Sequence, residues 1–131
     1  MAAHALINTL KSKRPAFGAW LALPGVIAAR TAAHASERLS WVCLDCEHGL
    51  IPLQPGAAEA IQAINQPTPG GGEPPSVLVR IPATGGAGAG GMGWQIKYAL
   101  DSGARGVIVP MVRFSLSACL YFTHFLKGEY T

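Results

Sequence analysis

The residues whose types and spacing could support chemistry stand at the end of one apolar stretch, residues 41–49, which reads WVCLDCEHG. The stretch begins as a buried strand and ends in Asp45, Glu47 and His48. In parallel α/β proteins, active sites lie at the carboxyl ends of strands. An imidazole beside a carboxylate suits a general base, because the carboxylate orients the ring and stabilises its protonated form. The alternative is a polar turn with His48 at the surface, since short motifs also occur by chance.

Arg80 is a second candidate, because it lies inside the apolar stretch VLVRI at residues 77–81. An arginine there must reach a carboxylate, a phosphate or solvent, since an unpaired buried charge is costly. It suits bidentate binding of a small anionic substrate. A structural ion pair with Asp45 or Glu47 is an equal alternative, and the sequence leaves both open.

Cys43 and Cys46 form a CxxC pattern, but no second pair of ligands completes a zinc site. Positions three apart in a strand face opposite sides, so both are predicted to be small buried side chains. Together with Cys119, they give an odd and low count, which indicates a reducing compartment rather than a disulfide framework.

The stretch around residues 83–93 is rich in glycine, and Gly86, Gly88 and Gly91 match GxGxxG. A dinucleotide site needs the glycines directly after the strand and an acidic residue about 20 positions further on, and this chain has neither. The stretch is interpreted as a flexible insertion, with a nucleotide-binding module as the alternative.

Composition bounds the remaining possibilities. The chain has 131 residues, 50% of them hydrophobic and 13% charged, which fits one small domain with a core. The net charge of +3 comes without a basic stripe, so no nucleic-acid partner is expected. No apolar run approaches the ~20 residues of a membrane span, and no secretory signal is recognisable. A cytoplasmic location is expected, with a mitochondrial one as the alternative, because residues 1–14 are weakly amphipathic and basic.

The elements that would position these side chains alternate between strands and helices. Strands are expected over residues 16–23, 39–45, 77–81 and 106–112, and helices over residues 4–13, 26–37, 54–65 and 94–102. The strands are continuously apolar, which is typical of parallel strands covered on their faces. The predicted fold class is therefore α/β. Four βα units make half of an eight-fold barrel or a small open sheet, and the pattern alone does not choose.

Four blocks in this order, FGAWLAL, WVCLDCEHG, VLVRIP and QIKYALDSGARGVIVPMV, resemble the HpcH/HpaI aldolase family. These are divalent-metal-dependent pyruvate aldolases, typified by 4-hydroxy-2-oxoheptanedioate aldolase and 2-keto-3-deoxy-L-rhamnonate aldolase. The resemblance covers about residues 6–112. It implies a homo-oligomeric (β/α)8 TIM barrel of about 250 residues. It also implies retro-aldol cleavage of a 4-hydroxy-2-oxo acid, a small-molecule substrate, to pyruvate and an aldehyde.

The resemblance also implies roles for individual residues. His48 matches the catalytic base of the family and Asp45 its dyad partner. Arg80 matches the arginine that binds the carboxylate and keto region of the substrate, and Trp20 and Glu47 match positions near the site. In the family a divalent metal (Mg²⁺, Mn²⁺ or Co²⁺) polarises the 2-keto oxygen, so the enolate forms without a Schiff-base lysine.

The chain departs from the family in two respects. The metal ligands of the family are a Glu and an Asp on later strands, beyond this chain, and residues 113–131 leave the family pattern. Residues 1–112 are therefore expected to form an incomplete N-terminal half-barrel, followed by a non-family tail. This chain alone is expected to bind no metal and to be inactive. The alternative is a non-catalytic truncated paralogue that associates with a full-length barrel; a lyase acting on acyl-CoA thioesters is the runner-up within the superfamily.

Overall fold

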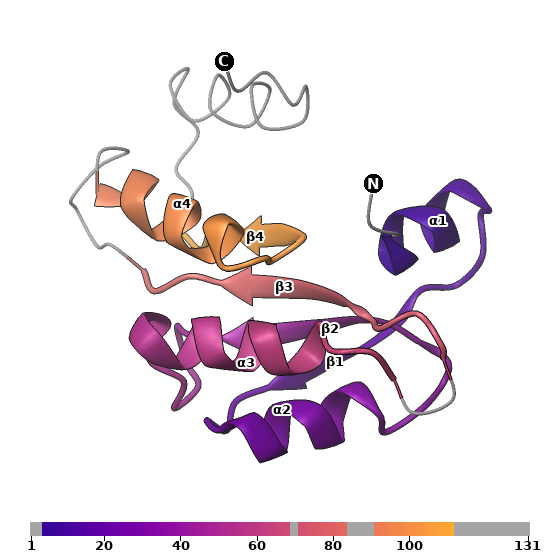
Figure 1. Ribbon diagram of the computed structural model, residues 1–131. Helices are drawn as coiled ribbons and strands as arrows, with labels where there is room; N and C mark the ends of the chain where they lie inside the picture. Colours follow the sequence, from indigo (N-terminus) through magenta and orange to yellow (C-terminus); the bar gives the residue numbers. More distant parts are fainter. Residues whose placement is uncertain (1–3, 69–70, 84–90, 112–131) are drawn as a thin grey trace.

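The computed structural model describes residues 4–68, 71–83 and 91–111 (Figure 1). Four parallel strands form one sheet in the order β1-β2-β3-β4. The strands are β1 (Phe17–Leu21), β2 (Leu39–Asp45), β3 (Ser76–Arg80) and β4 (Gly106–Ile108). The helices are α1 (Ala5–Lys11), α2 (Val26–Ala33), α3 (Ala58–Ile64) and α4 (Gly93–Asp101). The prediction of an α/β fold with parallel strands is confirmed.

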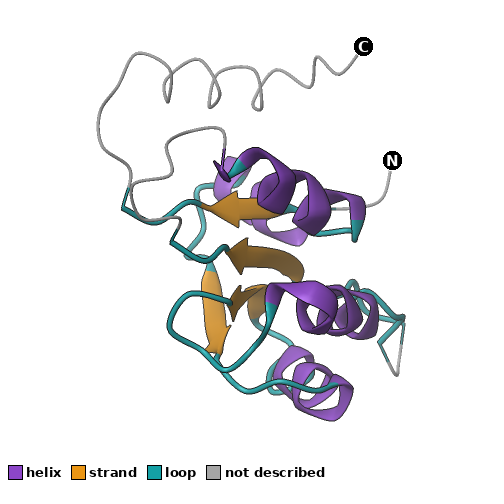
Figure 2. Ribbon diagram, turned by 90° about the vertical axis from the view of Figure 1, so that its left-hand side faces the viewer, coloured by secondary structure: helices purple, strands orange, loops and turns teal. Residues whose placement is uncertain are grey.

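The three connecting helices lie on one side of the sheet. Crossovers between parallel strands are right-handed, so a sheet whose strands follow chain order receives each connecting helix on the same face. Figure 2 shows the strands with α2, α3 and α4 all to one side. Among the described residues, no helix covers the opposite face.

The hydrophobic core lies between this sheet and its helices. Val42 and Leu44 of β2 and Val77 and Val79 of β3 are fully buried. Burying such a side chain contributes about 1.5–3 kcal/mol. The helices present mostly small residues to these strands, which lets them approach closely. The buried apolar residues of α2, α3 and α4 are Ala29, Ala33, Ala60, Ile61, Ala63, Ile64 and Ala99.

The strand register fixes which side chains share the opposite face. Trp20 pairs with Cys43, and Asp45 pairs with Arg80 on the neighbouring strand. Paired residues of parallel strands point to the same face, so Asp45 and Arg80 lie side by side where β2 and β3 end. The sheet thereby places a carboxylate, Asp45, and a guanidinium, Arg80, at the same edge.

Helix α1 lies against the amino ends of the strands. His4 Nδ1 lies 2.9 Å from Ser76 Oγ, and His4 Nε2 lies 3.3 Å from the carbonyl oxygen of Arg105. Thr9 Oγ1 lies 3.3 Å from Ser40 Oγ near the start of β2. Sequence analysis gave His4 no role, and the structure shows that it ties α1 to the sheet. No helix in the described part of the chain has the length and hydropathy needed to cross a bilayer.

Several predicted boundaries were wrong. The helix predicted over 26–37 ends at Ala33, and the strand predicted over 106–112 ends at Ile108. The helix predicted from residue 54 begins as α3 at Ala58, after a single wide turn, η1 (Leu53–Ala57). Gln54 is extended, with φ −119° and ψ 129°, because a residue before proline disfavours the helical conformation. Val112, the tail 113–131 and most of the glycine-rich stretch lie outside the described residues.

Gly18 is required by its strand neighbour Trp41. A Cβ on Gly18 would lie 1.9 Å from Cδ2 of the Trp41 ring, which packs over this glycine. Trp41 also meets Trp20 edge to face, with ring centroids 6.5 Å apart. The glycine therefore lets both tryptophans lie on the open face of the sheet.

We expect Gly18→Ala to displace the Trp41 ring and to lower the free energy of unfolding by about 1–3 kcal/mol, as overpacking does. Urea denaturation measures the loss, and near-UV circular dichroism reports the changed tryptophan pair. Gly93→Ala is the matched control, because a Cβ there meets no atom within 4 Å. A Gly18→Ala protein with the stability and near-UV spectrum of the original would contradict this packing argument.

Candidate active site

Asp45 closes the turn that follows β2. Its Oδ1 accepts the backbone N–H groups of Glu47 and His48, each at 3.1 Å. A carboxylate that binds the backbone two and three residues further along is a common way to fix such a turn. The end of β2 and the two residues that follow it are thereby held as one unit.

Asp45 and Arg80 form a bidentate pair across neighbouring strands. Arg80 Nε donates to Oδ1 at 2.9 Å, and Nη2 donates to Oδ2 at 2.6 Å. The Arg80 hydrogen bond, followed by the two backbone N–H groups, outweighs burial and holds the pKa of the Asp45 carboxyl well below its usual range. The Asp45 hydrogen bond likewise raises the pKa of Arg80. The ion-pair alternative for Arg80 is therefore realised in the structure.

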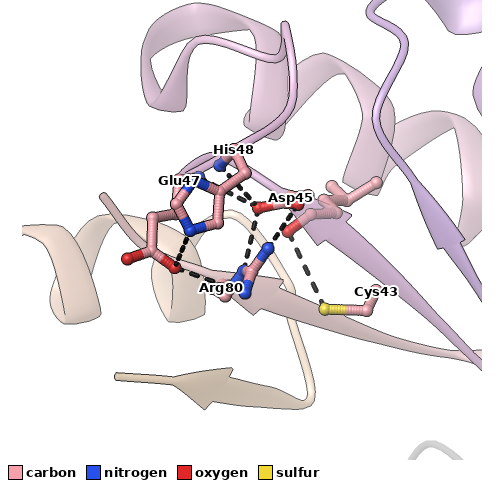
Figure 3. A network of polar contacts seen from close by, with 6 residues as sticks. Cys43, Asp45, Glu47, His48 and Arg80 are labelled. Carbon is pink, nitrogen blue, oxygen red and sulfur yellow. Dashed lines mark hydrogen bonds and ion pairs between the residues drawn. The ribbon is translucent and has the colours of Figure 1, made fainter. Parts of the chain in front are cut away.

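Glu47 connects Arg80 to His48 (Figure 3). Its Oε2 lies 3.3 Å from Arg80 Nη1 and 3.5 Å from His48 Nε2. The Glu47 side chain is only 8% exposed, whereas that of His48 is 71% exposed. The site thus has a buried acidic anchor and an imidazole that is open to solvent.

Trp20 lies against the same guanidinium. Cζ of Arg80 is 4.7 Å from the centroid of the Trp20 ring, a cation–π distance. Arg80 directs three of its nitrogens to carboxylates, and a guanidinium carries five N–H donors. Its side chain remains 23% exposed, and these contacts leave one N–H group on each terminal nitrogen without a carboxylate partner among the described residues.

The structure brings all five sequence-predicted site residues together: Trp20, Asp45, Glu47, His48 and Arg80. Their roles remain predictions. The contacts differ from the predicted dyad in one respect, because Asp45 binds the backbone of His48 while the ring of His48 contacts Glu47. An immobilised cation beside an accessible imidazole can bind a small carboxylate and transfer a proton next to it.

Two glycines and a tryptophan were missed. Gly18 and Trp41 shape the surface under Trp20, and Gly49 directly follows Glu47 and His48 in the same turn. The signal for Trp41 was available in the sequence, since it lies two and four residues before Cys43 and Asp45 and so shares their face. The need for Gly18 depends on strand register, which the sequence does not state.

The two cysteines of β2 and its end are chemically quiet. Both are free and buried, as predicted, and Cys43 lies on the opposite face from the core that includes Cys46. Burial raises the pKa of Cys43 to about 12 and that of Cys46 to about 11. Both thiols are therefore protonated at neutral pH and are poor nucleophiles and metal ligands. Cys119 lies outside the described residues.

The residues present do not fit a divalent metal. In the described parts of the chain, no group of three or more His, Cys, Asp or Glu side chains is arranged to hold an ion. Asp45 and Glu47 already face the Arg80 guanidinium, whose positive charge opposes a cation beside them. These residues by themselves therefore do not form a metal site.

Acid is expected to weaken the fold through Asp45. The pKa of Asp45 is depressed in the folded chain, so the stability it contributes is fully present above its usual value of 3.8 and declines as the pH falls below that value. Urea denaturation of the original chain and of Asp45→Asn at a series of acidic pH values measures this contribution of Asp45 to stability. The difference in unfolding free energy between them should narrow in acid. Asp101→Asn, at an exposed pair on α4, is the control; a difference that stays constant with pH would contradict the assignment.

Comparisons with known proteins find similarity to two aldolases. No protein-family model matches the chain. The chain is 34% identical over 105 residues to a hydroxypyruvate/pyruvate aldolase of Agrobacterium fabrum, covering 80% of this chain and 34% of that protein. It is 33% identical over 111 residues to a hydroxypyruvate/pyruvate aldolase of Paraburkholderia phytofirmans, covering 82% of this chain and 36% of that protein. The chain thus spans about a third of the length of these curated relatives, and the similarity supports a relationship to the aldolases.

Proposed function

We propose that this chain forms the substrate-binding and proton-transferring side of a pyruvate aldolase site of the HpcH/HpaI type. The observation that carries the proposal is the Arg80 guanidinium, fixed between two carboxylates and a tryptophan ring beside an accessible His48. The similarity to proteins named hydroxypyruvate/pyruvate aldolase supports it. The proposed reaction is retro-aldol cleavage of a 4-hydroxy-2-oxo acid to pyruvate and an aldehyde.

The proposed architecture is the first part of a (β/α)8 barrel. Strands that follow chain order, with connecting helices on one face, are what consecutive units of such a barrel show. In that arrangement the face that carries Trp20, Cys43, Asp45 and Arg80 points to the barrel interior. The site would then open at the carboxyl ends of the strands, where barrel enzymes place their active sites.

Each residue has a distinct part in this proposal. The remaining N–H groups of Arg80 bind the carboxylate of the 2-oxo acid, and its positive charge stabilises the enolate that forms when the C3–C4 bond breaks. His48 takes the proton of the 4-hydroxyl group as the aldehyde is released. Asp45 and Trp20 hold the guanidinium in place. A divalent ion such as Mg²⁺, Mn²⁺ or Co²⁺ would polarise the keto oxygen if it were bound, and its ligands would come from outside the described residues.

Titration of the purified chain with oxamate, an unreactive analogue of pyruvate, tests the proposal. We expect saturable shifts of the NMR signals of the Trp20 indole and of the His48 ring, with propionamide as the uncharged control ligand. Binding should weaken as salt is added, because the main contact is ionic. The absence of binding at any concentration, or equal binding of propionamide, would contradict an Arg80-centred site for oxo acids.

An activity assay tests the metal part separately. We expect no release of pyruvate from 4-hydroxy-2-oxo acids by this chain alone with Mg²⁺, Mn²⁺ or Co²⁺, because the carboxylates of the site are committed to Arg80. Metal-dependent turnover by the chain alone would contradict the proposal that this chain does not hold the metal by itself.

Non-catalytic association with a full-length barrel is the second candidate. In the described part of the chain, β1 and β4 each have a strand neighbour on one side only. On β1, Phe17 is 58% exposed and Trp20 is 50% exposed. Exposed edge strands invite pairing with another sheet. Co-expression with a full-length relative, followed by size-exclusion chromatography, would yield a mixed complex if this candidate is right and separate species if it is wrong.

A further inference from the structure

The two carboxylates of the site differ in how much of their acceptor capacity is used. Asp45 Oδ1 accepts from Arg80 Nε and from the backbone N–H groups of Glu47 and His48, and Oδ2 accepts from Arg80 Nη2. All of these contacts hold the Asp45 carboxylate against its own turn and the neighbouring strand. Its contact with His48 is made to the backbone N–H group, so it fixes the position of the His48 backbone but not the orientation of the His48 ring.

Glu47 faces the ring itself. Its Oε2 lies 3.5 Å from Nε2 of His48, and Figure 3 shows the ring turned toward this carboxylate. The Glu47 side chain is nearly buried and is held from the other side by Arg80 Nη1 at 3.3 Å. The anchored partner of this pair is therefore the carboxylate, and the ring is the exposed partner.

We propose that Glu47 is the positioning residue for His48 and holds the ring proton on Nε2, which leaves Nδ1 as the nitrogen that accepts a proton. A carboxylate can only accept, so the ring nitrogen beside it is stabilised as the N–H form. This inference rests on the proposed function for its meaning, since it assigns the accepting atom of the proposed base. It also revises the predicted dyad, in which Asp45 had the orienting part.

Glu47 also links the two halves of the site. The same oxygen contacts Arg80 and His48, so an anion that binds the free edge of Arg80 and draws the guanidinium toward itself acts on the carboxylate that orients the base. Substrate binding and base orientation are then coupled through one side chain. Asp45 remains the group that keeps Arg80 in register.

The tautomer of His48 can be read directly on the full chain. Long-range ¹H–¹⁵N correlation spectra of ¹⁵N-histidine-labelled protein distinguish the Nε2–H and Nδ1–H forms, in buffer alkaline enough for neutral rings. His48→Gln identifies its signals among the four histidines. We expect the Nε2–H form to dominate, and Glu47→Gln to lower the ratio of Nε2–H to Nδ1–H by about two- to fivefold, the range for an exposed charge contact.

Three further variants sharpen the test. Asp45→Asn keeps an acceptor for the backbone N–H groups and should change the ratio less than Glu47→Gln does. Glu47→Asp keeps the charge on a shorter side chain and should retain part of the effect that Glu47→Gln removes. Glu59→Gln, the same chemical change at an exposed position of α3, is the matched control. Backbone amide spectra confirm that each variant is folded.

The outcomes separate this inference from the proposed function. A ratio that changes in Asp45→Asn and not in Glu47→Gln overturns the inference, and so does a ratio that responds to neither. A ratio that depends on Glu47 supports the positioning role, whether or not oxamate binds. Failure of oxamate to bind would then count against the aldolase proposal alone.

Discussion

Replacement of Arg80 by leucine is expected to remove oxo-acid binding and to destabilise the fold at the same time. Without the guanidinium, the Asp45 and Glu47 carboxylates, whose side chains are 9% and 8% exposed, lose the cation that both of them face. An unpaired buried charge is far more costly than the pair. We expect a clearly lower urea midpoint of unfolding and an affinity for oxamate reduced about tenfold or more, since the ionic contact to the ligand is lost.

Controls separate the loss of charge from the loss of geometry. Arg80→Lys keeps a cation but loses the two-pronged contact with Asp45, so it should recover part of the stability and little of the oxamate affinity. Asp45→Asn in the Arg80→Leu background should recover stability, because it removes the negative charge that has lost its partner. Such non-additive effects on stability are expected for residues in contact. Arg38→Leu, at an exposed position, is the matched control. An Arg80→Leu chain that unfolds at the original urea concentration would show that the ion pair contributes nothing.

The Arg80 contacts also show how far sequence reasoning about the site could reach. An arginine in an apolar strand has to reach a carboxylate, a phosphate or solvent, and an ion pair with Asp45 or Glu47 was one of two equal alternatives for Arg80. The register then decides the pairing, because Asp45 and Arg80 are direct partners on β2 and β3. Chemistry thus offered the ion pair as one of two alternatives, and only the structure could show that Arg80 contacts both acids at once.

The fold followed the sequence most closely where burial is strongest. The bounds of β2, residues 39–45, were predicted without error, since every residue from Val42 to Asp45 is buried and the polar turn marks the end. The end of α2 was missed, because the alanine-rich sequence carries no glycine or proline there. Instead the Ser36 hydroxyl accepts the backbone N–H of Arg38, a local contact that competes with helix.

Tertiary context decided what the sequence could not. The strand expected to continue to residue 112 ends at Ile108, because the ladder between β3 and β4 extends only as far as Arg80 and Ile108. Which carboxylate meets the His48 ring depends on the turn after β2, and that turn is set by backbone hydrogen bonds to Asp45. Spacing along the chain does not encode this choice, since Asp45 and Glu47 are both close to His48 in sequence.

Gly49→Ala is expected to destabilise the turn that carries Glu47 and His48. A Cβ on Gly49 would lie 2.3 Å from the carbonyl oxygen of Asp45 and 3.0 Å from Cα of Ala22. Both are backbone atoms, so a rotamer change cannot relieve the clash. Leu50 N–H donates to the carbonyl oxygen of Ala22 at 2.7 Å, which ties this turn to the end of β1. We expect the free energy of unfolding to fall by about 1–3 kcal/mol, as for other overpacked sites.

The same substitution should reach the chemistry, because the turn that must move carries Glu47 and His48. A shifted turn separates Glu47 from Arg80 and the His48 ring, so the Gly49→Ala chain should lose the Nε2–H preference of His48 although no charged group has been changed. Gly93→Ala supplies the control for an added methyl group in open space. If Gly49→Ala keeps both the urea midpoint and the His48 tautomer, the close approach of Gly49 to β2 is not what holds the site. If both change together, the position of the base depends on the backbone contact between the turn and the ends of β1 and β2.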